Sequence, residues 1–224
     1  MTEKSVRPSI PPVTTADPKW RRLPEERPQQ ILVAAIEAFG ENGIAGAKLE
    51  DIAARAGVSK GTIYLYFQSK EDLFREVVRQ LLVPRMREVE RALDTGTPRE
   101  QLERYIRLQL THHAHPGAAG WIRLVMTELH KHRDLAAFYY DEVISAGNSV
   151  LGGILRRGMD IGEFRRLDPA EALSIIKAII LTTTLWSHTP LPTSSGVEIS
   201  RATHADAIVD FVFHALRPEP DANQ

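Results

Sequence analysis

Apolar residues recur every three or four positions along most of the chain from about residue 25 onward, which is the period of an amphipathic α-helix. The first such stretch predicts a helix from Glu25 or Pro28 to Asn42, with Gly43 and Gly46 marking the turn that follows. Its apolar stripe consists of Ile31, Leu32, Ala35, Ile36 and Phe39. No segment alternates as a strand would, and we find no internal repeat, so the pattern predicts an all-α chain.

The stretch from Leu49 to Phe67 has the pattern of two short helices joined by a tight turn. Gly57 follows the first helix, where glycine reaches the left-handed conformation without a steric penalty. Ser59 can cap the second helix by accepting a hydrogen bond from the Thr62 N–H. The inward positions are Leu49, Ile52, Ala53, Ala56, Ile63 and Phe67. The outward face of the second helix carries Gly61, Thr62, Tyr64 and Leu65, with Lys60 at its edge. Such a face fits a DNA groove.

Capping residues mark the later helix starts. Ser69 opens a long helix with acidic residues in its first turn, and Pro84 falls inside the pattern, where it should kink or end the helix. Thr97 and Asp168 each precede a proline and, two residues further on, a glutamate. The remaining helices are predicted near residues 101–113, 118–132, 135–159, 169–186 and 198–216, with a loop at 189–197, which gives about nine helices in all.

The composition is that of a small regulator with a hydrophobic core. The 224 residues are 43% hydrophobic and include no cysteine, which excludes disulfides and thiolate metal sites and favours the reducing cytosol. The amino terminus is charged and proline-rich, unlike a signal peptide. Lys177 and three threonines interrupt the most apolar stretch, at 175–186, so we expect no membrane span and a cytoplasmic protein.

Charge is distributed weakly along the chain. The net charge is −1, with +2 over residues 1–92 and −3 over residues 93–224, so DNA binding must depend on locally placed cations and on two copies acting together. Six of the fourteen prolines lie in residues 1–28, which indicates a flexible arm. A disordered tail is the default interpretation of this arm. The alternative is a minor-groove contact by Lys19, Arg21 and Arg22 around Trp20.

The segment GVSKGTIYLYFQSKEDLF, residues 57–74, resembles the signature of TetR-family transcriptional regulators, and the resemblance covers roughly residues 28–75. It implies a homodimer with a three-helix DNA-binding domain. It also implies a larger helical domain that binds a small molecule and dimerises through its last two helices. Ligand binding would change the separation of the two DNA-binding heads, so that they no longer match a palindromic operator. The corresponding division is a flexible arm at 1–24, a helix-turn-helix domain at 25–69, a ligand-binding and dimerisation domain at 70–216 and a tail at 217–224. No cofactor, metal or membrane partner is expected.

The chain departs from the family pattern before the second helix. Ala47 and Lys48 stand where many relatives have two hydroxyl residues, so the helix loses a cap at a typical cost of ~1 kcal/mol. Lys48 would instead contact a phosphate directly. Leu65 occupies a position that is often polar, and there it could pack on a thymine methyl group.

The resemblance assigns DNA-contact roles to the remaining positions. Ser59, Tyr66 and Lys70 would contact phosphates, which positions the domain without discriminating between sequences. The candidates for base edges are Lys60, Thr62, Tyr64 and Leu65. For Tyr64 and Tyr66 the alternative is a packing role, because aromatic residues on short helices commonly belong to the core.

Large apolar residues of the carboxy-terminal part suit either a ligand pocket or an ordinary core. They are Trp121, Met126, Phe138, Tyr139, Met159 and Trp186. Trp121 and Trp186 are the best pocket candidates, with Glu128 or His130 as polar partners. The last two helices have apolar faces that fit either core or a four-helix dimer seam, and the resemblance favours the seam. These faces consist of Leu173, Ile176, Ile180, Ile208, Phe211 and Val212.

Two further features have a plain and a specific interpretation. His112, His113 and His115 crowd together and could converge with His130 and His132 on a zinc ion, but the spacing is no recognised ligand pattern. The favoured interpretation is a helix end, where histidines complement the helix dipole. Pro84 is either a passive kink or a hinge between head and body.

We conclude from the sequence that the chain is a ligand-responsive, sequence-specific transcriptional regulator. A repressor is favoured over an activator, because blocking DNA sterically needs no further partner surface. Two alternatives are a helical enzyme and a helical sensor that acts through protein partners without DNA. No Gly-rich phosphate loop, GxSxG elbow or HExxH motif supports the enzyme. The intact outward face with Lys60 and Lys70 argues against the sensor.

Overall fold

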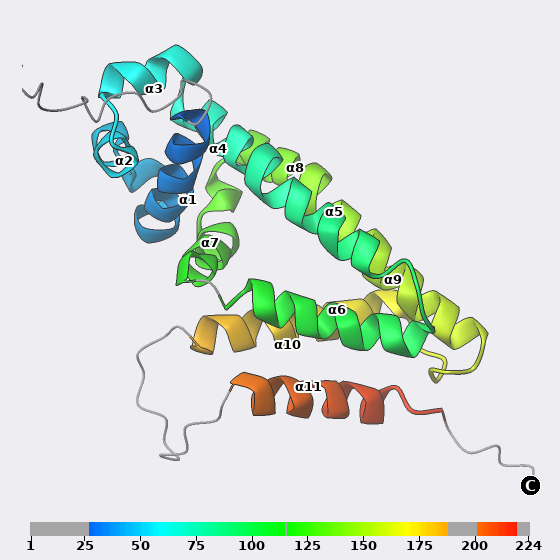
Figure 1. Cartoon of the computed structure of the whole chain (residues 1–224). Helices are drawn as coiled ribbons and strands as arrows, with labels where there is room; N and C mark the ends of the chain where they lie inside the picture. The colour runs from blue at the N-terminus through cyan, green and yellow to red at the C-terminus, as the bar shows by residue number, and fades with distance from the viewer. Residues whose placement is uncertain (1–26, 115, 188–200, 219–224) are drawn as a thin grey trace, which may run out of the picture.

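The structure is a computed structural model that describes residues 27–114, 116–187 and 201–218, and every regular element in these ranges is helical (Figure 1). The predicted flexible arm, His115 and the predicted loop at 189–197 lie outside the described residues, as does most of the predicted tail. The all-α prediction is confirmed.

The helices follow the predicted order. The first four are α1 (Arg27–Gly46), α2 (Leu49–Ala56), α3 (Lys60–Tyr66) and α4 (Lys70–Val77), and α4 continues through a π-helical turn (Val78–Leu82) into α5 (Val83–Ala92). Then come α6 (Pro98–His112), α7 (Pro116–Thr127), a short 3₁₀ turn (Leu129–Lys131) and α8 (Arg133–Tyr139). A second π-helical turn (Tyr140–Ile144) joins α8 to α9 (Ser145–Asp160), and α10 (Pro169–Ser187) and α11 (Arg201–Ala215) complete the chain. Counting each helix that continues through a π turn once, the described residues form nine helices.

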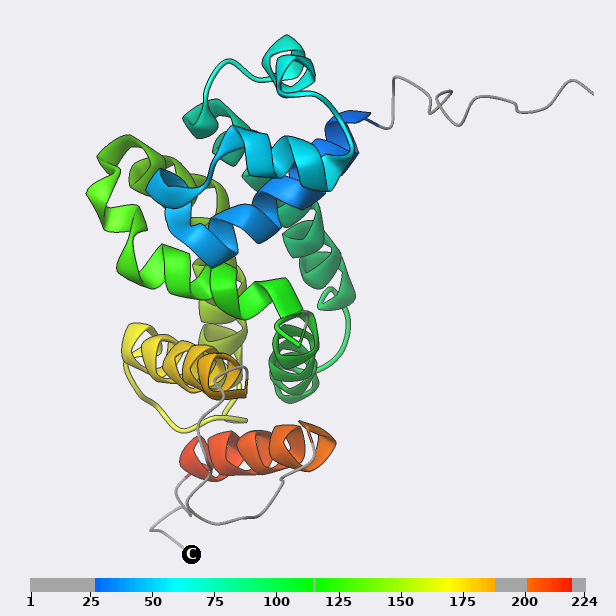
Figure 2. The ribbon, with the colours of Figure 1, turned by 90° about the vertical axis from the view of Figure 1, so that its left-hand side faces the viewer.

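The molecule has a head and a body (Figure 1). Helices α1 to α3 form the head at one end, and α6, α10 and α11 lie at the opposite end (Figure 2). The continuous helices α4–α5 and α8–α9 run side by side from the head into the body, where their two π-helical turns touch. Helix α7 packs along α1 and also contacts α10, so it links the two ends.

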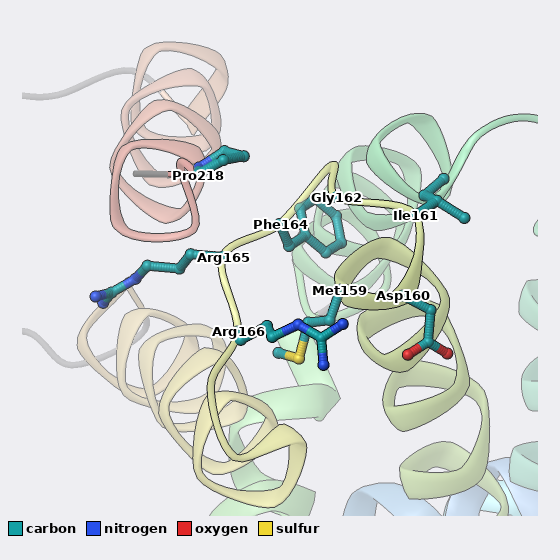
Figure 3. A pocket seen from close by; sticks show the side chains of 8 residues that line it. All are labelled: Met159, Asp160, Ile161, Gly162, Phe164, Arg165, Arg166 and Pro218. Carbon is teal, nitrogen blue, oxygen red and sulfur yellow. The ribbon is translucent and has the colours of Figure 1, made fainter. Parts of the chain in front are cut away.

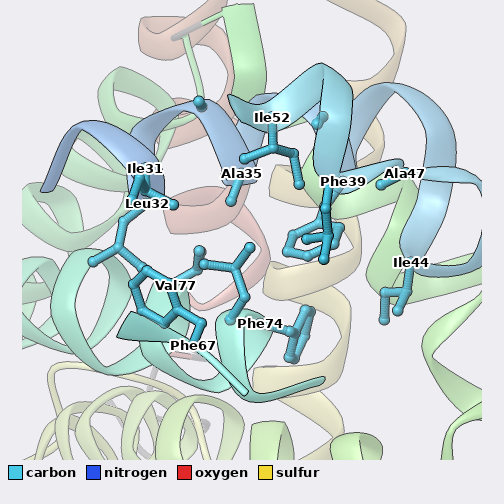
Figure 4. Close-up of a cluster of buried hydrophobic side chains, with 14 of the residues drawn as sticks. Ile31, Leu32, Ala35, Phe39, Ile44, Ala47, Ile52, Phe67, Phe74 and Val77 are labelled. Carbon is cyan, nitrogen blue, oxygen red and sulfur yellow. The ribbon is translucent and has the colours of Figure 1, made fainter. Parts of the chain in front are cut away.

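Two hydrophobic cores hold this arrangement. The first contains the interior of the head, with fully buried Ile31, Phe39 and Phe74 (Figure 4), and it continues into α7 and α8 through Trp121 and Leu135. The second joins the inward faces of α6, α9, α10 and α11. The first core therefore crosses the domain boundary that we placed at residue 69, and the head is packed directly onto part of the body.

The predicted helix starts depend on local hydrogen bonds that the structure contains. Ser69 Oγ accepts the Asp72 N–H at 3.0 Å, and the Asp72 carboxylate accepts the Gln68 N–H at 3.0 Å. Thr97 and Glu100 form a complete capping box in front of α6. Because each cap involves residues three or four positions apart, the sequence alone was enough to place these starts.

Pro84 neither ends its helix nor interrupts it. It is the second residue of α5, and the preceding turn is π-helical, with the Val83 N–H donating to the carbonyl of Val78. Proline lacks an N–H and crowds the carbonyl four residues before it, and a wider turn at this point relieves both problems. The prediction that the helix ends or kinks at Pro84 is replaced by a continuous helix with a π-helical turn.

Helix α10 over Pro169–Trp186 is long and apolar enough to cross a membrane by length and composition alone. In the structure this helix packs against α9, α7 and α6, with Ile176 and Ile180 buried in the second core. It is therefore built into the helical body, in keeping with the interruption by Lys177 noted in the sequence.

Candidate functional site

Helices α2 and α3 cross closely because the residues between them are small or apolar. Ala53 and Ile63 are buried at the crossing, and Gly57 adopts the left-handed conformation (φ 66°) that lets α2 end there. Ser59 caps α3, since its Oγ accepts the Thr62 N–H at 3.1 Å and lies 2.8 Å from Thr62 Oγ1. The predicted turn and cap are confirmed, and they fix which face of α3 points outward.

The outward face of α3 exposes large side chains that the fold does not use. Leu65 is 82% exposed and Tyr64 is 52% exposed, while Tyr66 is also exposed beside the buried Phe67. Exposed apolar surface of this size on a seven-residue helix contributes little to stability. The packing alternative therefore does not describe Tyr64, and it describes Tyr66 only in part, through its tilted contact with Phe67.

Lys60 is already engaged on this face. Its Nζ donates to Oε1 of Glu50 on α2 and lies 5.9 Å from the centre of the Tyr64 ring. The hydrogen bond from Lys60 holds the pKa of Glu50 below its usual value, and the same contact raises the pKa of Lys60. The ammonium of Lys60 has three donors, so it can contact a base with a donor that Glu50 leaves unused.

Lys70 has a structural role that the sequence did not indicate. Its Nζ donates to the carbonyl oxygens of Ala45 and Ala47 at 3.0 and 3.1 Å, which ties the start of α4 to the turn between α1 and α2. An ammonium has three N–H donors, so one remains for a phosphate oxygen. A phosphate role for Lys70 thus coexists with a role in holding the head together.

Lys48 differs from Lys70 in being unused by the fold. It is exposed at the position before α2, and its side chain makes no capping hydrogen bond, as we predicted from the missing hydroxyl residue. Among the described residues no carboxylate pairs with it. Lys48 is therefore available for a phosphate, and Gly61 is exposed nearby on the first turn of α3.

A cavity of about 840 Å³ lies in the body below the head. Its walls come from seven helices, α1 and α5 to α10, and from the two π-helical turns. The walls are mainly apolar and include Leu82, Val83, Ile122, Val125, Val150 and Ile180. A concave, mostly apolar space with a few polar groups is the usual form of a small-molecule site.

Trp121 connects this cavity to the head. It lines the cavity, is buried, and stacks on Phe74 of α4 with ring centres 5.1 Å apart and planes at 14°. Phe74 in turn meets Phe39 of α1 edge-on at 6.1 Å. Trp121 Nε1 also donates to the hydroxyl of Tyr139 at 3.3 Å, and burial raises the pKa of Tyr139. Of the four predicted pocket residues, Trp121 is the one that lines the cavity.

The other three predicted pocket residues lie away from this cavity, and their role in ligand binding stays a prediction. Glu128 is half-buried at the end of α7 beside Gly43, His130 is exposed in the 3₁₀ turn, and Trp186 is 61% exposed on α10. None lines the cavity.

The cavity has polar groups that the sequence analysis missed. The Gln109 side chain donates to the Tyr105 hydroxyl at 3.1 Å, and burial raises the pKa of this tyrosine. Lys177 of α10 also lines the cavity, on the inward side of its helix. A lysine interrupting an apolar helix was the available signal, but we used it only to argue against a membrane span.

The predicted dimer residues are mostly interior. Ile176, Ile180, Ile208 and Val212 are buried within their own chain, and Leu173 is half-buried against the second core. In the single chain the apolar stripe of each helix thus faces the protomer itself, and a dimer seam at these positions stays a prediction. On the described parts of α10 and α11, the large apolar side chains that stay exposed are Ile175, Trp186 and Phe211.

The predicted histidines that the structure describes do not gather into one site. His112 and His113 lie at the end of α6 on the cavity wall, where His113 Nδ1 is 3.1 Å from Thr184 Oγ1, whereas His132 lies in the turn before α8. Among residues 27–114, 116–187 and 201–218, no group of histidines and carboxylates could hold a metal ion.

A second, shallower hollow of about 680 Å³ lies at the far end of the body, between the end of α9 and Pro218 (Figure 3). Arg165 on its wall donates from Nε to the Ala215 carbonyl at 2.7 Å and so caps the end of α11. Arg166 is exposed in the loop after α9. The arrangement serves the docking of α11 and offers no enclosed site.

Comparisons with known proteins agree with the geometry. Residues 31–77 match the model of bacterial regulatory proteins of the tetR family, and residues 92–203 match a tetracyclin repressor-like C-terminal domain. The fatty acid metabolism regulator protein of Bacillus subtilis is 32% identical over 174 residues, which cover 73% of this chain and 86% of that protein. The regulator RutR of Escherichia coli is 37% identical over 92 residues, 41% of this chain and 43% of RutR.

Two solved structures share the fold. The fatty acid degradation regulator FadR of Bacillus halodurans has a TM-score of 0.69 at 22% identity, covering 84% of this chain and 99% of that one. FadR of Bacillus subtilis, solved in complex with stearoyl-CoA, has a TM-score of 0.67 at 24% identity over the same shares.

Proposed function

The chain belongs to the TetR family of bacterial transcriptional regulators, and on that premise we propose that it is a repressor which a small molecule releases from a palindromic operator. Family membership makes it a DNA-binding transcriptional regulator and not an enzyme. The observation that carries the proposal is the cavity whose wall residue Trp121 stacks on Phe74 of α4, which in turn contacts Phe39 of the head. We place the protein in the cytoplasm, where its DNA is.

DNA binding is assigned to one exposed surface of the head, which we call the operator face. Lys48, Tyr66 and Lys70 hold phosphates, and Ser59 fixes the start of α3 while contacting the backbone. Lys60, Thr62, Tyr64 and Leu65 contact base edges, and Gly61 allows close approach. Support comes from the exposure of Tyr64 and Leu65 and from the free ammonium of Lys48.

Homodimerisation is assigned to the exposed apolar surface of α10 and α11. Ile175 and Phe211 are 61% and 64% exposed there, and Trp186 adds to the surface at one end. Pairing with a second copy would bury these side chains and place two operator faces on one side of the dimer. Two faces related by twofold symmetry match an inverted repeat with half-sites about one helical turn apart.

The effector we propose is a long-chain acyl compound, such as a coenzyme A ester. The apolar walls and the volume of about 840 Å³ suit an extended hydrocarbon chain. The Bacillus subtilis structure with stearoyl-CoA gives a precedent in a protein of the same fold.

Release of DNA would begin at the aromatic contacts between cavity and head. A ligand that displaces Trp121 moves Phe74 of α4, because the two rings are stacked. A shift of α7 would move α1 directly, since Gly40 and Gly120 bring the backbones of these two helices into contact. The Arg123 guanidinium strengthens this crossing by donating to the Gly40 carbonyl at 3.0 Å. Pro84, as a hinge, stays a prediction, and its Ala variant should then alter ligand-induced release.

The first test is selection from a random duplex library at two salt concentrations, with Tyr64→Ala alongside. We expect enrichment of an inverted repeat by the native protein and loss of that enrichment in the variant. Palmitoyl-CoA should then release the selected duplex in a mobility-shift assay, while free coenzyme A should not. Weak binding that vanishes with salt and selects no sequence would favour the sensor that acts through protein partners.

A further inference from the structure

Lys177 is a cation among apolar residues on the wall of the cavity. It lies on α10 beside Ile176, and its neighbours along the cavity wall are Ile180 and Leu181. Its side chain is half-buried and lines the cavity instead of the surface that we assign to the dimer. Among the described residues that line the cavity, it is the one half-buried lysine or arginine.

The fold satisfies Lys177 only in part. Its Nζ donates to Oδ1 of Asn148 on α9 at 2.6 Å, which is a neutral acceptor for one of three donors. Within residues 27–114, 116–187 and 201–218, no carboxylate forms an ion pair with it. Burial lowers the pKa of Lys177, which means that the protein stabilises the charged ammonium less well than water does.

Most of the other lysine, arginine and carboxylate side chains on the cavity wall are exposed to solvent. Arg85 and Arg87 of α5 are exposed, as are Glu90 and Asp141, and Glu142 is half-buried. An exposed charge is screened by water, whereas a half-buried ammonium with a neutral partner attracts an incoming anion strongly. Lys177 is therefore the half-buried ammonium of a mainly apolar wall, and Glu142 is the half-buried carboxylate.

We propose that Lys177 recognises an acidic group of the effector, so that the cavity selects an amphiphilic anion over a neutral chain of the same length. This inference rests on the proposed function, since it concerns the compound that occupies the same cavity. The acidic group has two possible sources, the free carboxylate of a long-chain acid or the acidic groups of its coenzyme A ester. In either case the anion takes a donor that Asn148 leaves unused.

The test compares three probes of one chain length, palmitate, hexadecanol and palmitoyl-CoA, by calorimetry on the full chain. The native protein should bind at least one acidic probe about tenfold or more tightly than hexadecanol, as expected of a hydrogen bond to a charged group. Lys177→Met should remove that preference without weakening hexadecanol. Lys177→Gln, which keeps a donor for Asn148, serves if the methionine variant folds poorly, and Lys131→Met is the exposed control away from the cavity.

Each outcome decides between the possibilities. Loss confined to palmitate identifies the free carboxylate as the recognised group, and loss confined to palmitoyl-CoA identifies the ester. Equal binding of all three probes to the native protein, or equal loss of all three in Lys177→Met, overturns the role of Lys177 and leaves the proposed function standing. Failure of every long-chain probe to bind the native protein overturns the proposed long-chain effector, and this inference with it, whereas the duplex selection tests DNA binding independently.

Discussion

The operator face and the cavity lie on the two sides of the aromatic group formed by Phe39, Phe74 and Trp121. The two regions are assembled from the sequence in different ways. The operator face comes from one short stretch, Lys48 to Lys70. The cavity wall takes residues from Gln29 to Leu181. A short stretch fixes its own geometry through caps and a turn, whereas a wall made of distant helices exists only after those helices have packed.

The two regions also differ in packing. The interior of the head is filled, with Ile31, Phe39 and Phe74 fully buried, while the body leaves about 840 Å³ open beside Trp121. Filled interiors lose stability when a side chain is removed, and an open one gains stability when a ligand fills it. Mutations should therefore affect stability strongly on the side of the head and ligand response mainly on the side of the cavity.

Phe74 lies where the two regions meet, and its loss should have the largest effect. Phe74→Ala should lower the free energy of unfolding by about 3–5 kcal/mol, because it removes a fully buried ring that contacts Phe39, Trp121 and Tyr139. Urea unfolding followed by circular dichroism measures this. Leu65→Ala is the exposed control and should stay within about 0.5 kcal/mol of the native protein. Equal effects of the two variants would contradict a shared, filled core.

The crossing of α1 and α7 is the next most sensitive point. A Cβ atom at Gly120 would lie 2.7 Å from the Gly40 carbonyl oxygen, so Gly120→Ala must push the two helices apart, at a cost of about 1–3 kcal/mol. Gly117→Ala on the same helix meets nothing within 4 Å and should be neutral or stabilising by less than about 1 kcal/mol. If thermal unfolding finds the two variants alike, the close contact between head and body does not exist in solution.

Lys70 tests whether a residue of the operator face also supports the fold. Lys70→Ala should cost about 1 kcal/mol, because it removes the hydrogen bonds to Ala45 and Ala47. It should also weaken binding to all duplexes alike and reduce the slope of log affinity against log salt by about one. Fluorescence anisotropy at several salt concentrations measures the slope. An unchanged slope would remove the phosphate contact and leave Lys70 a structural residue.

Lys48 should separate DNA binding from stability, with the smallest effect on the fold. Lys48→Ala should reduce the salt slope by about one with little change in stability, because the side chain makes no cap. Lys48→Thr should reduce the slope equally but raise the free energy of unfolding by up to about 1 kcal/mol, since it restores a cap to α2. Equal free energies of unfolding for Lys48→Ala and Lys48→Thr would mean that the threonine hydroxyl accepts no hydrogen bond from the first turn of α2.

The sequence determined the features that depend on neighbours in the chain. The caps at Ser59, Ser69 and Thr97 and the turn at Gly57 involve residues within four positions, so local hydrogen bonding and helical periodicity were enough to place the helices and the outward face of α3.

Only the tertiary structure decided which residues meet across helices. Periodicity gave α10 and α11 an apolar face but could not say that Ile176 and Val212 point into their own chain, nor that the exposed apolar side chains are Ile175 and Phe211. Periodicity also did not predict that Lys177 lines the cavity, or that Lys70 donates to the carbonyls of Ala45 and Ala47. These contacts depend on the angles at which whole helices pack. Those angles are determined by many side chains that are far apart in the sequence, so no short stretch specifies them.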